Sequence, residues 1–385
     1  MRNFLFVTSL MVFLTGCANI REIQYQAYAV GIGIDYKDHE YHVVLQFLDF
    51  SNVAKTDQGK SDRPVPVWLG TGKGKTVEDA IIQIYHGIQI PINYDQISLF
   101  VFGKSLLEHR LGKTLKSLDT NFNIRQTGLA YGTEEKVEKI FTTKVPFNYA
   151  YSNSRINQPE FMQQQDSSVP TISLQELIFQ FNEKTKTIVL PRITINEKIV
   201  KQNLEYLPVN IFDGAYILKD EKLKGYLSQQ NLEGFIRVNN KAVRSPVIVG
   251  EETDGKEELV QIELLKPKVK RVIDKDKNEV NIGLDINISA IIREATKKEV
   301  LSPRVKRKIK EKITNEVYAA YLKSHQIGGD IYQFEDFMYR FMYEDWKTTK
   351  KKDDFPVLKK ENIHVKVRPL KSINKINSGI KLPLE

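Results

Sequence analysis

The segment Ala27–Asp35, AYAVGIGID, and the segment Tyr41–Phe50, YHVVLQFLDF, are two β-rich runs that decide how the fold begins. The second run alternates apolar and polar residues, as a half-buried strand does. The first run carries Gly31 and Gly33, which lets another part of the chain approach it closely. Because only a short polar stretch, Lys37–His39, separates the runs, we predict a β-hairpin that turns there.

Outward from this hairpin, helical and strand patterns alternate up to about residue 200. After a polar loop at Ser51–Arg63, we predict strands at Val67–Leu69, Gln96–Phe102, Gln126–Tyr131 and Thr187–Ile195, and helices at Val77–His86, Lys104–Leu118, Glu134–Phe141 and Ser173–Asn182. The stretch Asn148–Pro170 is polar and predicts a loop. Pro191 has no N–H to donate, so we expect it at the edge or the end of its sheet.

The second half begins near Pro208 and predicts another sheet. Strand patterns recur at Val209–Leu218, Gly234–Val238, Val243–Val249, Leu259–Leu265, Val269–Ile273 and Val280–Ile291. A long helix is expected from Ser302, a second over Ile331–Trp346, and a last strand over Asn362–Val367. The stripe Val305, Ile309, Ile313 and Val317 should face the sheet. The pattern indicates an α+β protein of two or three domains, with mixed α/β sheets packed against helices.

The stretch Gly70–Thr76, GTGKGKT, lies between a predicted strand and a predicted helix and is similar to a phosphate-binding loop. A Walker motif needs glycine five residues before Gly74, and Leu69 stands there. The hydroxyl of Thr76 can instead cap the helix that follows, with Asp79 three residues on. We therefore expect a capped helix and no nucleotide site.

The sequence shows no motif that indicates catalysis or metal binding. Of the six histidines, the closest pair, His39 and His42, falls in the predicted hairpin and lacks helical metal-site spacing. A G-x-S-x-G serine elbow is absent, and Cys17 is the one cysteine. We expect no enzyme activity, no cofactor and no metal.

The segment Met1–Cys17 is typical of a bacterial lipoprotein signal. Arg2 precedes an apolar run from Phe4 to Leu14, and the lipobox Leu14–Cys17 follows. The run is too short for a permanent transmembrane helix. We predict cleavage after Gly16 and a lipidated Cys17 carrying S-diacylglycerol and N-palmitoyl groups, so that two or more acyl chains hold the protein on the outer face of the cell membrane. The alternative is an ordinary secretory signal with an incidental cysteine.

The net charge of +9 becomes +8 once Arg2 leaves with the signal. Anionic lipid headgroups suit such a charge, whereas nucleic acid is a poor partner outside the cytoplasm. The most basic stretch is Lys297–Lys312, with a net charge of about +6. Its residues Arg304, Arg307 and Lys308 should point away from the buried stripe. They form either an ordinary solvated face or a surface for the membrane or a partner.

Several segments together resemble one family, the Ger(x)C lipoproteins, which are the C subunits of nutrient germinant receptors in spore-forming bacteria. The resemblance rests on the lipobox followed by Arg21–Ile23, on Ala29–Asp35, on Gly74–Thr76 with Glu78 and Ala80, on Ile188–Pro191, and on Ala215–Leu227, AYILKDEKLKGYL, with Gly234. It spans nearly the whole mature chain in order. Two departures stand out. Ala18 replaces the usual tryptophan after the cysteine, and Asp330–Phe334, DIYQF, replaces a D-I-F-G-x-G pattern, which predicts that a helix starts there.

The resemblance implies an elongated protein of about three domains, anchored outside the inner membrane of the spore, that acts without catalysis beside an A subunit and a multi-spanning B subunit. The division that we predict is a signal peptide at 1–16, a tether at 17–26, an N-terminal germination-protein domain at 27–200 with room for two subdomains, a C-terminal domain at 208–370 and a tail at 371–385. The family supplies no ligand-contacting residues for this subunit. The competing hypotheses are a lipid-anchored solute-binding protein of a transporter and an envelope-modifying enzyme.

Overall fold

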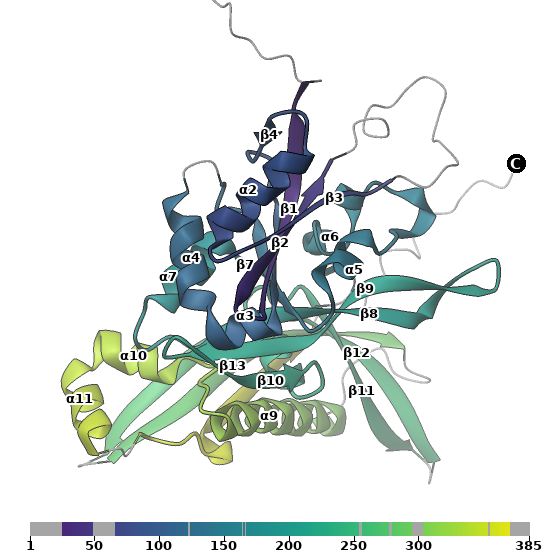
Figure 1. Ribbon diagram of the computed structural model, residues 1–385. Coiled ribbons are helices and arrows are strands. Elements are labelled where there is room, and N and C mark those ends of the chain that lie inside the picture. Colours follow the sequence, from purple (N-terminus) through teal and green to yellow (C-terminus); the bar gives the residue numbers. More distant parts are fainter. Residues whose placement is uncertain are drawn as a thin grey trace, which may run out of the picture.

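The chain forms two β-sheets with helices packed against them, as the computed structural model in Figure 1 shows. The structure describes residues 25–48, 66–121, 124–163, 165, 167–253, 256–276, 279–294, 303–352 and 355–369. Both sheets combine parallel and antiparallel pairs, and helices alternate with strands through the first. The predicted α+β class is confirmed.

The first sheet holds ten strands in the described part of the chain, in the order β10-β9-β8-β6-β5-β1-β2-β3, with β4 beside β1 and β7 beside β6. The predicted hairpin is confirmed, because β1 and β2 pair antiparallel around a two-residue turn in which Asp38 and His39 both have positive φ. The strands are β1 (Ala27–Lys37), β2 (Glu40–Phe47), β3 (Trp68–Gly74), β4 (Ile92–Asn93), β5 (Leu99–Gly103), β6 (Leu129–Thr133), β7 (Ile172–Ser173), β8 (Ile188–Gln202), β9 (Glu205–Lys219) and β10 (Lys222–Ser228).

Helices cover both faces of the first sheet. Alternate residues of β1 face opposite sides, so Ile32 and Ile34 join a core with α2 (Val77–Gly87), α3 (Lys104–His109), α4 (Leu111–Thr120) and α7 (Leu174–Phe181). The other face packs against α5 (Val137–Thr142), and α6 (Pro159–Gln163) follows it in the chain. The single helix expected over Lys104–Leu118 is broken, because Arg110 leaves the helical conformation with φ −140°.

The second sheet has the order β11-β12-β13-β14 and is covered by a long helix, α9 (Pro303–Gln326). The predicted stripe is confirmed, since Val305, Ile309, Ile313 and Val317 are all buried in the core beneath it. The remaining elements are β11 (Arg244–Thr253), β12 (Lys256–Asp276), β13 (Glu279–Glu294), β14 (Ile363–Pro369), α8 (Glu233–Val238), α10 (Phe334–Phe341) and α11 (Tyr343–Lys352).

Three expectations for these strands were wrong. Gly234–Val238 is a helix, α8, because Gly234 lets it cross α9 so closely that an added Cβ would lie 2.2 Å from the Glu316 carbonyl oxygen. The two runs expected at 259–265 and 269–273 form one strand, β12, which continues through a register shift between Leu265 and Lys268. Pro191 lies inside β8 and pairs with β9. It is tolerated because β6 pairs with β8 only at Arg192.

Strand β9 separates the two hydrophobic cores and contributes side chains to both. Tyr216 and Leu218 belong to the core of the first sheet, whereas Ala215 and Ile217 belong to the core beneath α9. This alternation follows from the two-residue period of a strand. The first sheet therefore continues through the expected boundary at 200–208 and ends with β10, and both halves of the chain pack on the same strand.

Candidate functional site

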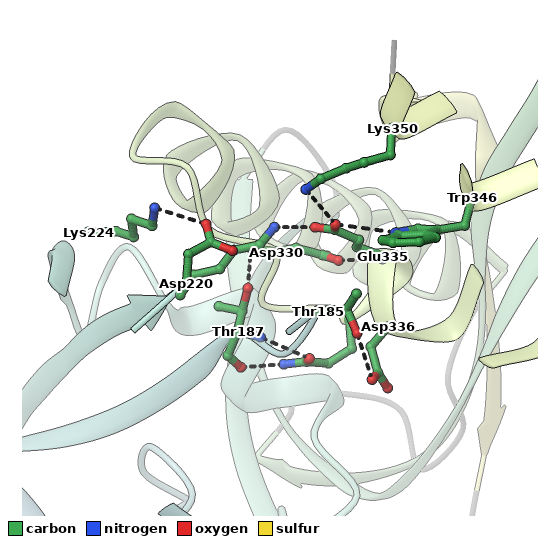
Figure 2. Close-up of polar contacts among 11 residues, drawn as sticks. Thr185, Thr187, Asp220, Lys224, Asp330, Glu335, Asp336, Trp346 and Lys350 are labelled. Carbon is green, nitrogen blue, oxygen red and sulfur yellow. Dashed lines mark hydrogen bonds and ion pairs between the residues drawn. The ribbon is translucent and has the colours of Figure 1, made fainter. Parts of the chain in front are cut away.

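A buried polar cluster joins the ends of β8 and β9 to helices α10 and α11 (Figure 2). We call it the polar junction. Its hydrogen bonds and ion pairs connect residues up to 151 positions apart, and it lies where the first sheet meets the C-terminal helices. Its members are Thr185, Lys186, Thr187, Lys219, Asp330, Gln333, Glu335, Asp336 and Lys350.

Glu335 stands at the centre of the junction. Its Oε2 lies 2.6 Å from Nζ of Lys219 at the end of β9, and its Oε1 lies 3.1 Å from Nζ of Lys350 on α11. Trp346 donates a further hydrogen bond of 3.3 Å to the same carboxylate, as Figure 2 shows. Burial favours the neutral acid, but the hydrogen bond and charge of Lys219, aided by Lys350, outweigh it and lower the pKa of Glu335. Glu335 is therefore an ionised carboxylate held by three donors.

Asp330 is the second buried carboxylate. Its backbone N–H donates to Oγ1 of Thr187 at 2.9 Å, and its Oδ2 accepts from the backbone N–H of Glu335 at 2.7 Å. Its Oδ1 is buried and has no hydrogen-bond partner in the described part of the chain. Burial raises the pKa of Asp330. The pKa values of Asp330 and Glu335 are therefore shifted in opposite directions.

Gln333 and Asp336 tie the same turn to the residues before β8. Gln333 has φ 60°, a conformation that favours glycine, and its side chain pairs with both the N–H and the C=O of Thr187. Asp336 accepts from Thr185 at 3.2 Å and lies 2.7 Å from Nζ of Lys186. Burial opposes the ionisation of Asp336, but the hydrogen bond and charge of Lys186 outweigh it and lower its pKa. A helix starts in this segment as expected, but α10 begins at Phe334 and not at Ile331, and the helix expected to run to Trp346 is interrupted at Met342, which has φ −141°.

The chemistry of the junction is that of a structural clamp. A cavity of about 210 Å³ adjoins it, lined in part by Lys219, Asp330 and His325. The carboxylates of Glu335 and Asp336 are bound by lysines, and the His325 ring stacks on Tyr321 at 5.5 Å. Within the described ranges, no group of three His, Cys, Asp or Glu side chains could hold a metal ion. The arrangement fixes the ends of β8 and β9 to α10 and α11.

The basic residues singled out on α9 differ from one another. Arg307 is exposed and lies 3.9 Å from Glu311, while Arg304 is also exposed. Lys308 does not point away as expected. It is half-buried and donates to the carbonyl oxygen of Gly250 in β11, because its long side chain reaches from the border of the apolar stripe to the sheet. Lys297 and Lys298, like Cys17 and its lipobox, lie outside the described residues.

The strand expected at Val67–Leu69 continues through the glycine-rich stretch before α2. Gly70, Gly72 and Gly74 lie in β3, which packs so tightly on α2 that a Cβ on Gly72 would lie 2.0 Å from the Ala80 carbonyl oxygen. The predicted cap is confirmed, since Oγ1 of Thr76 accepts from the N–H of Asp79 at 3.0 Å. Close packing accounts for the glycines, so nothing in their geometry indicates phosphate.

Sequence reasoning missed the polar junction. Its acids and lysines are ordinary surface residue types, and the pairs form only after folding brings distant segments together. The sequence did give one indication, because Asp330–Phe334 departs from the glycine pattern of the family at this turn.

Comparison with known proteins covers both halves of the chain. A family profile described as spore germination protein N-terminal domain matches residues 19–195, and one described as spore germination B3/GerAC like, C-terminal, matches residues 213–371. A structure titled "Crystal Structure of the GerBC protein" is similar with a TM-score of 0.48 and 16% identity over 89% of this chain and 97% of that chain. Curated proteins give no match. Because the two profiles follow each other along nearly all of the chain, it belongs to the Ger(x)C family of spore germination proteins.

Proposed function

We propose that the chain is the lipid-anchored, non-catalytic C subunit of a nutrient germinant receptor, acting with an A subunit and a multi-spanning B subunit on the outer face of the spore's inner membrane. One observation carries this proposal. The single cysteine, Cys17, ends a lipobox two residues before the first germination-protein profile begins. Removal of the signal would thus leave the matched region attached to the membrane by its first residue.

The fold supports a relay better than a catalyst. Strand β9 belongs to both cores, and the polar junction clamps its end to α10 and α11. Displacement of one sheet would therefore be transmitted to the other through packed and hydrogen-bonded elements. Helices in the described ranges are too short or too polar to cross a membrane.

Two measurements test the proposal. Mass spectrometry of the chain purified from membranes should find Cys17 as the first residue, carrying a diacylglyceryl group. Purification of the tagged chain from solubilised spore membranes should recover the A and B subunits. An unmodified Cys17 would contradict the anchor, and recovery of an ATP-driven transporter instead would favour the solute-binding alternative.

A further inference from the structure

Large apolar side chains are exposed on four segments around the first sheet. Tyr25 precedes β1, Trp68 starts β3, Phe147 and Tyr149 follow α5, and Leu204 and Tyr206 lie at the turn of the β8–β9 hairpin. We call these six residues the aromatic rim. In Figure 1 the start of β1 lies at the upper end of the molecule and the β8–β9 turn projects at the right.

A cavity links three of these segments. It has a volume of about 270 Å³ and is lined by Val67 next to Trp68, by Phe147 and Tyr149, and by Leu207 next to Tyr206. The rim is tied to the start of β1 as well, because the N–H of Leu48, after β2, donates to the carbonyl of Tyr28 at 2.9 Å. Segments far apart in sequence thus present apolar groups around one depression.

Two rim residues are held outward by unfavourable backbone conformations. Phe147 has φ 64° and is 83% exposed, and Leu204 has φ 72° and is 89% exposed. Bulky residues rarely adopt positive φ, and the two-residue turn at Asn203–Leu204 strongly favours glycine in second place. The Phe147 ring contacts the ring of Tyr149, another rim residue, at 6.4 Å, whereas the Leu204 side chain is too exposed to repay its strain by burial in the fold. Strain kept at an exposed apolar residue points to a contact outside the chain.

The short distance between Tyr25 and the lipidated Cys17 identifies the membrane as the partner of the aromatic rim. Seven residues separate Cys17 from Tyr25, which even fully extended hold Tyr25 within about 28 Å of a lipidated cysteine. Trp and Tyr side chains prefer the headgroup level of a bilayer. Lys144 lines the same cavity, and Nζ of Lys201 lies 4.6 Å from the centre of the Tyr206 ring. This mixture of basic and aromatic groups suits a lipid surface.

We propose that the aromatic rim inserts into the interface of the membrane that carries the anchor and thereby sets the orientation of the whole subunit. The inference rests on the proposed lipidation of Cys17. With the rim against the bilayer, α9 and α11, which lie at the opposite end of the molecule from the start of β1 in Figure 1, stay open to partner subunits.

Tryptophan fluorescence tests the rim directly, because Trp68 and Trp346 are the two tryptophans of the chain. Trp346→Phe leaves Trp68 as the reporter, and Trp68→Phe leaves Trp346 as the matched control. The lipidated full chain is reconstituted into phosphatidylcholine vesicles with plain or brominated acyl chains. We expect brominated lipid to quench Trp68 and leave Trp346 unchanged.

Substitutions in the rim supply a second readout. Leu204→Gly relieves the turn, so it should keep or raise the melting temperature while reducing Trp68 quenching. Combining it with Phe147→Asn should weaken the partition of the unlipidated Cys17→Ser chain into neutral vesicles by at least about tenfold, because two apolar contacts are lost. Phe341→Ser, an equally exposed aromatic position on α10, is the control and should change neither.

The outcomes separate the two proposals. If the wild-type chain does not float with vesicles in a density gradient, the proposed lipid anchor is wrong, and the proposed insertion of the aromatic rim is wrong as well. If it floats and Trp68 is not quenched, the anchor stands and the rim inference is overturned. Loss of partner subunits by Leu204→Gly without any change in vesicle contact would assign the rim to a protein partner and also overturn it.

Discussion

Lys219 and Glu335 form an ion pair of 2.6 Å within the polar junction, between the end of β9 and α10, with only 13% and 6% of their side chains exposed. Lys219 is the last residue of β9, the strand whose sides face two different cores. The pair therefore connects β9 to α10. Its contribution to the free energy of unfolding can be measured with substitutions.

Removing one partner of this pair should be costly. Lys219→Met leaves Glu335 buried with Lys350 as its remaining cation, and we expect the free energy of unfolding to fall by about 3 kcal/mol. Lys224→Met is the matched control, because Lys224 pairs with the half-exposed Asp220 at 3.1 Å and should cost less than about 1 kcal/mol. Denaturant titration measures both, and equal effects would contradict a special role for the junction.

Asp330 should make stability depend on pH. Burial raises its pKa above the ordinary 3.8, so the folded chain holds the proton at pH values where the unfolded chain releases it. The stabilisation is present below pH 3.8 and is lost as the pH rises through the folded-state pKa. Asp330→Asn abolishes this titration and keeps an oxygen for the Glu335 N–H. Its unfolding free energy relative to wild type should therefore rise as the pH increases above about 4 and through the folded-state pKa.

Glu335→Gln provides the opposite case. The pKa of Glu335 is lowered from 4.5, so ionisation stabilises the wild type above that value, and the stabilisation disappears as the pH falls through the folded-state pKa. The variant should lose stability relative to wild type as the pH rises. Parallel pH profiles for the two variants would show that the assigned environments of the acids are wrong.

The glycine-rich strand β3 should not tolerate larger side chains at its glycines, and it should not bind nucleotide. Gly72→Ala places a Cβ against the backbone of α2, and we expect a loss of about 2–4 kcal/mol. Lys75→Ala removes an exposed ion pair with Glu40 of 3.0 Å and should change stability by less than about 1 kcal/mol. Calorimetry that detected micromolar binding of ATP would contradict the packing explanation.

The basic face of α9 divides into two kinds of residue. Reversing Arg304 and Arg307 to Glu should preserve the melting temperature while weakening recovery of partner subunits or binding to anionic vesicles at low salt. Lys308→Glu should lower the melting temperature, because it removes the hydrogen bond to Gly250. If the Arg304 and Arg307 reversal changes no binding, the face is a solvated surface.

Local signals in the sequence predicted the local parts of the fold. The β1–β2 hairpin, the Thr76 cap and the α9 stripe depend on neighbouring residues, and all three are confirmed. The helical state of Gly234–Val238 depends on the approach of α9, some 80 positions away, and was therefore missed. The segment Ala215–Leu227 contributed to the family resemblance, but the burial of Ala215–Leu218 on both sides became evident only when both cores were seen.

The polar junction was beyond prediction for the same reason. Glu335 and Lys219 are 116 positions apart by their numbering, and neither residue type signals burial. Gln333 carried a partial signal, because it stands where the family pattern has glycine, and its φ of 60° is a conformation that favours glycine. Its side chain uses that conformation to reach Thr187, which no local pattern could reveal.

Spore germination tests the central claim most directly. In a spore former that relies on this receptor alone, the gene for the chain is deleted and replaced by the wild type or by Cys17→Ala, and the fall in optical density after nutrient addition is recorded. We predict that the wild type restores germination, whereas the deletion and Cys17→Ala spores stay dormant with nutrients and still respond to a trigger that bypasses receptors. Deletion spores that germinate with nutrients at the wild-type rate would contradict the assignment of this chain as a receptor subunit.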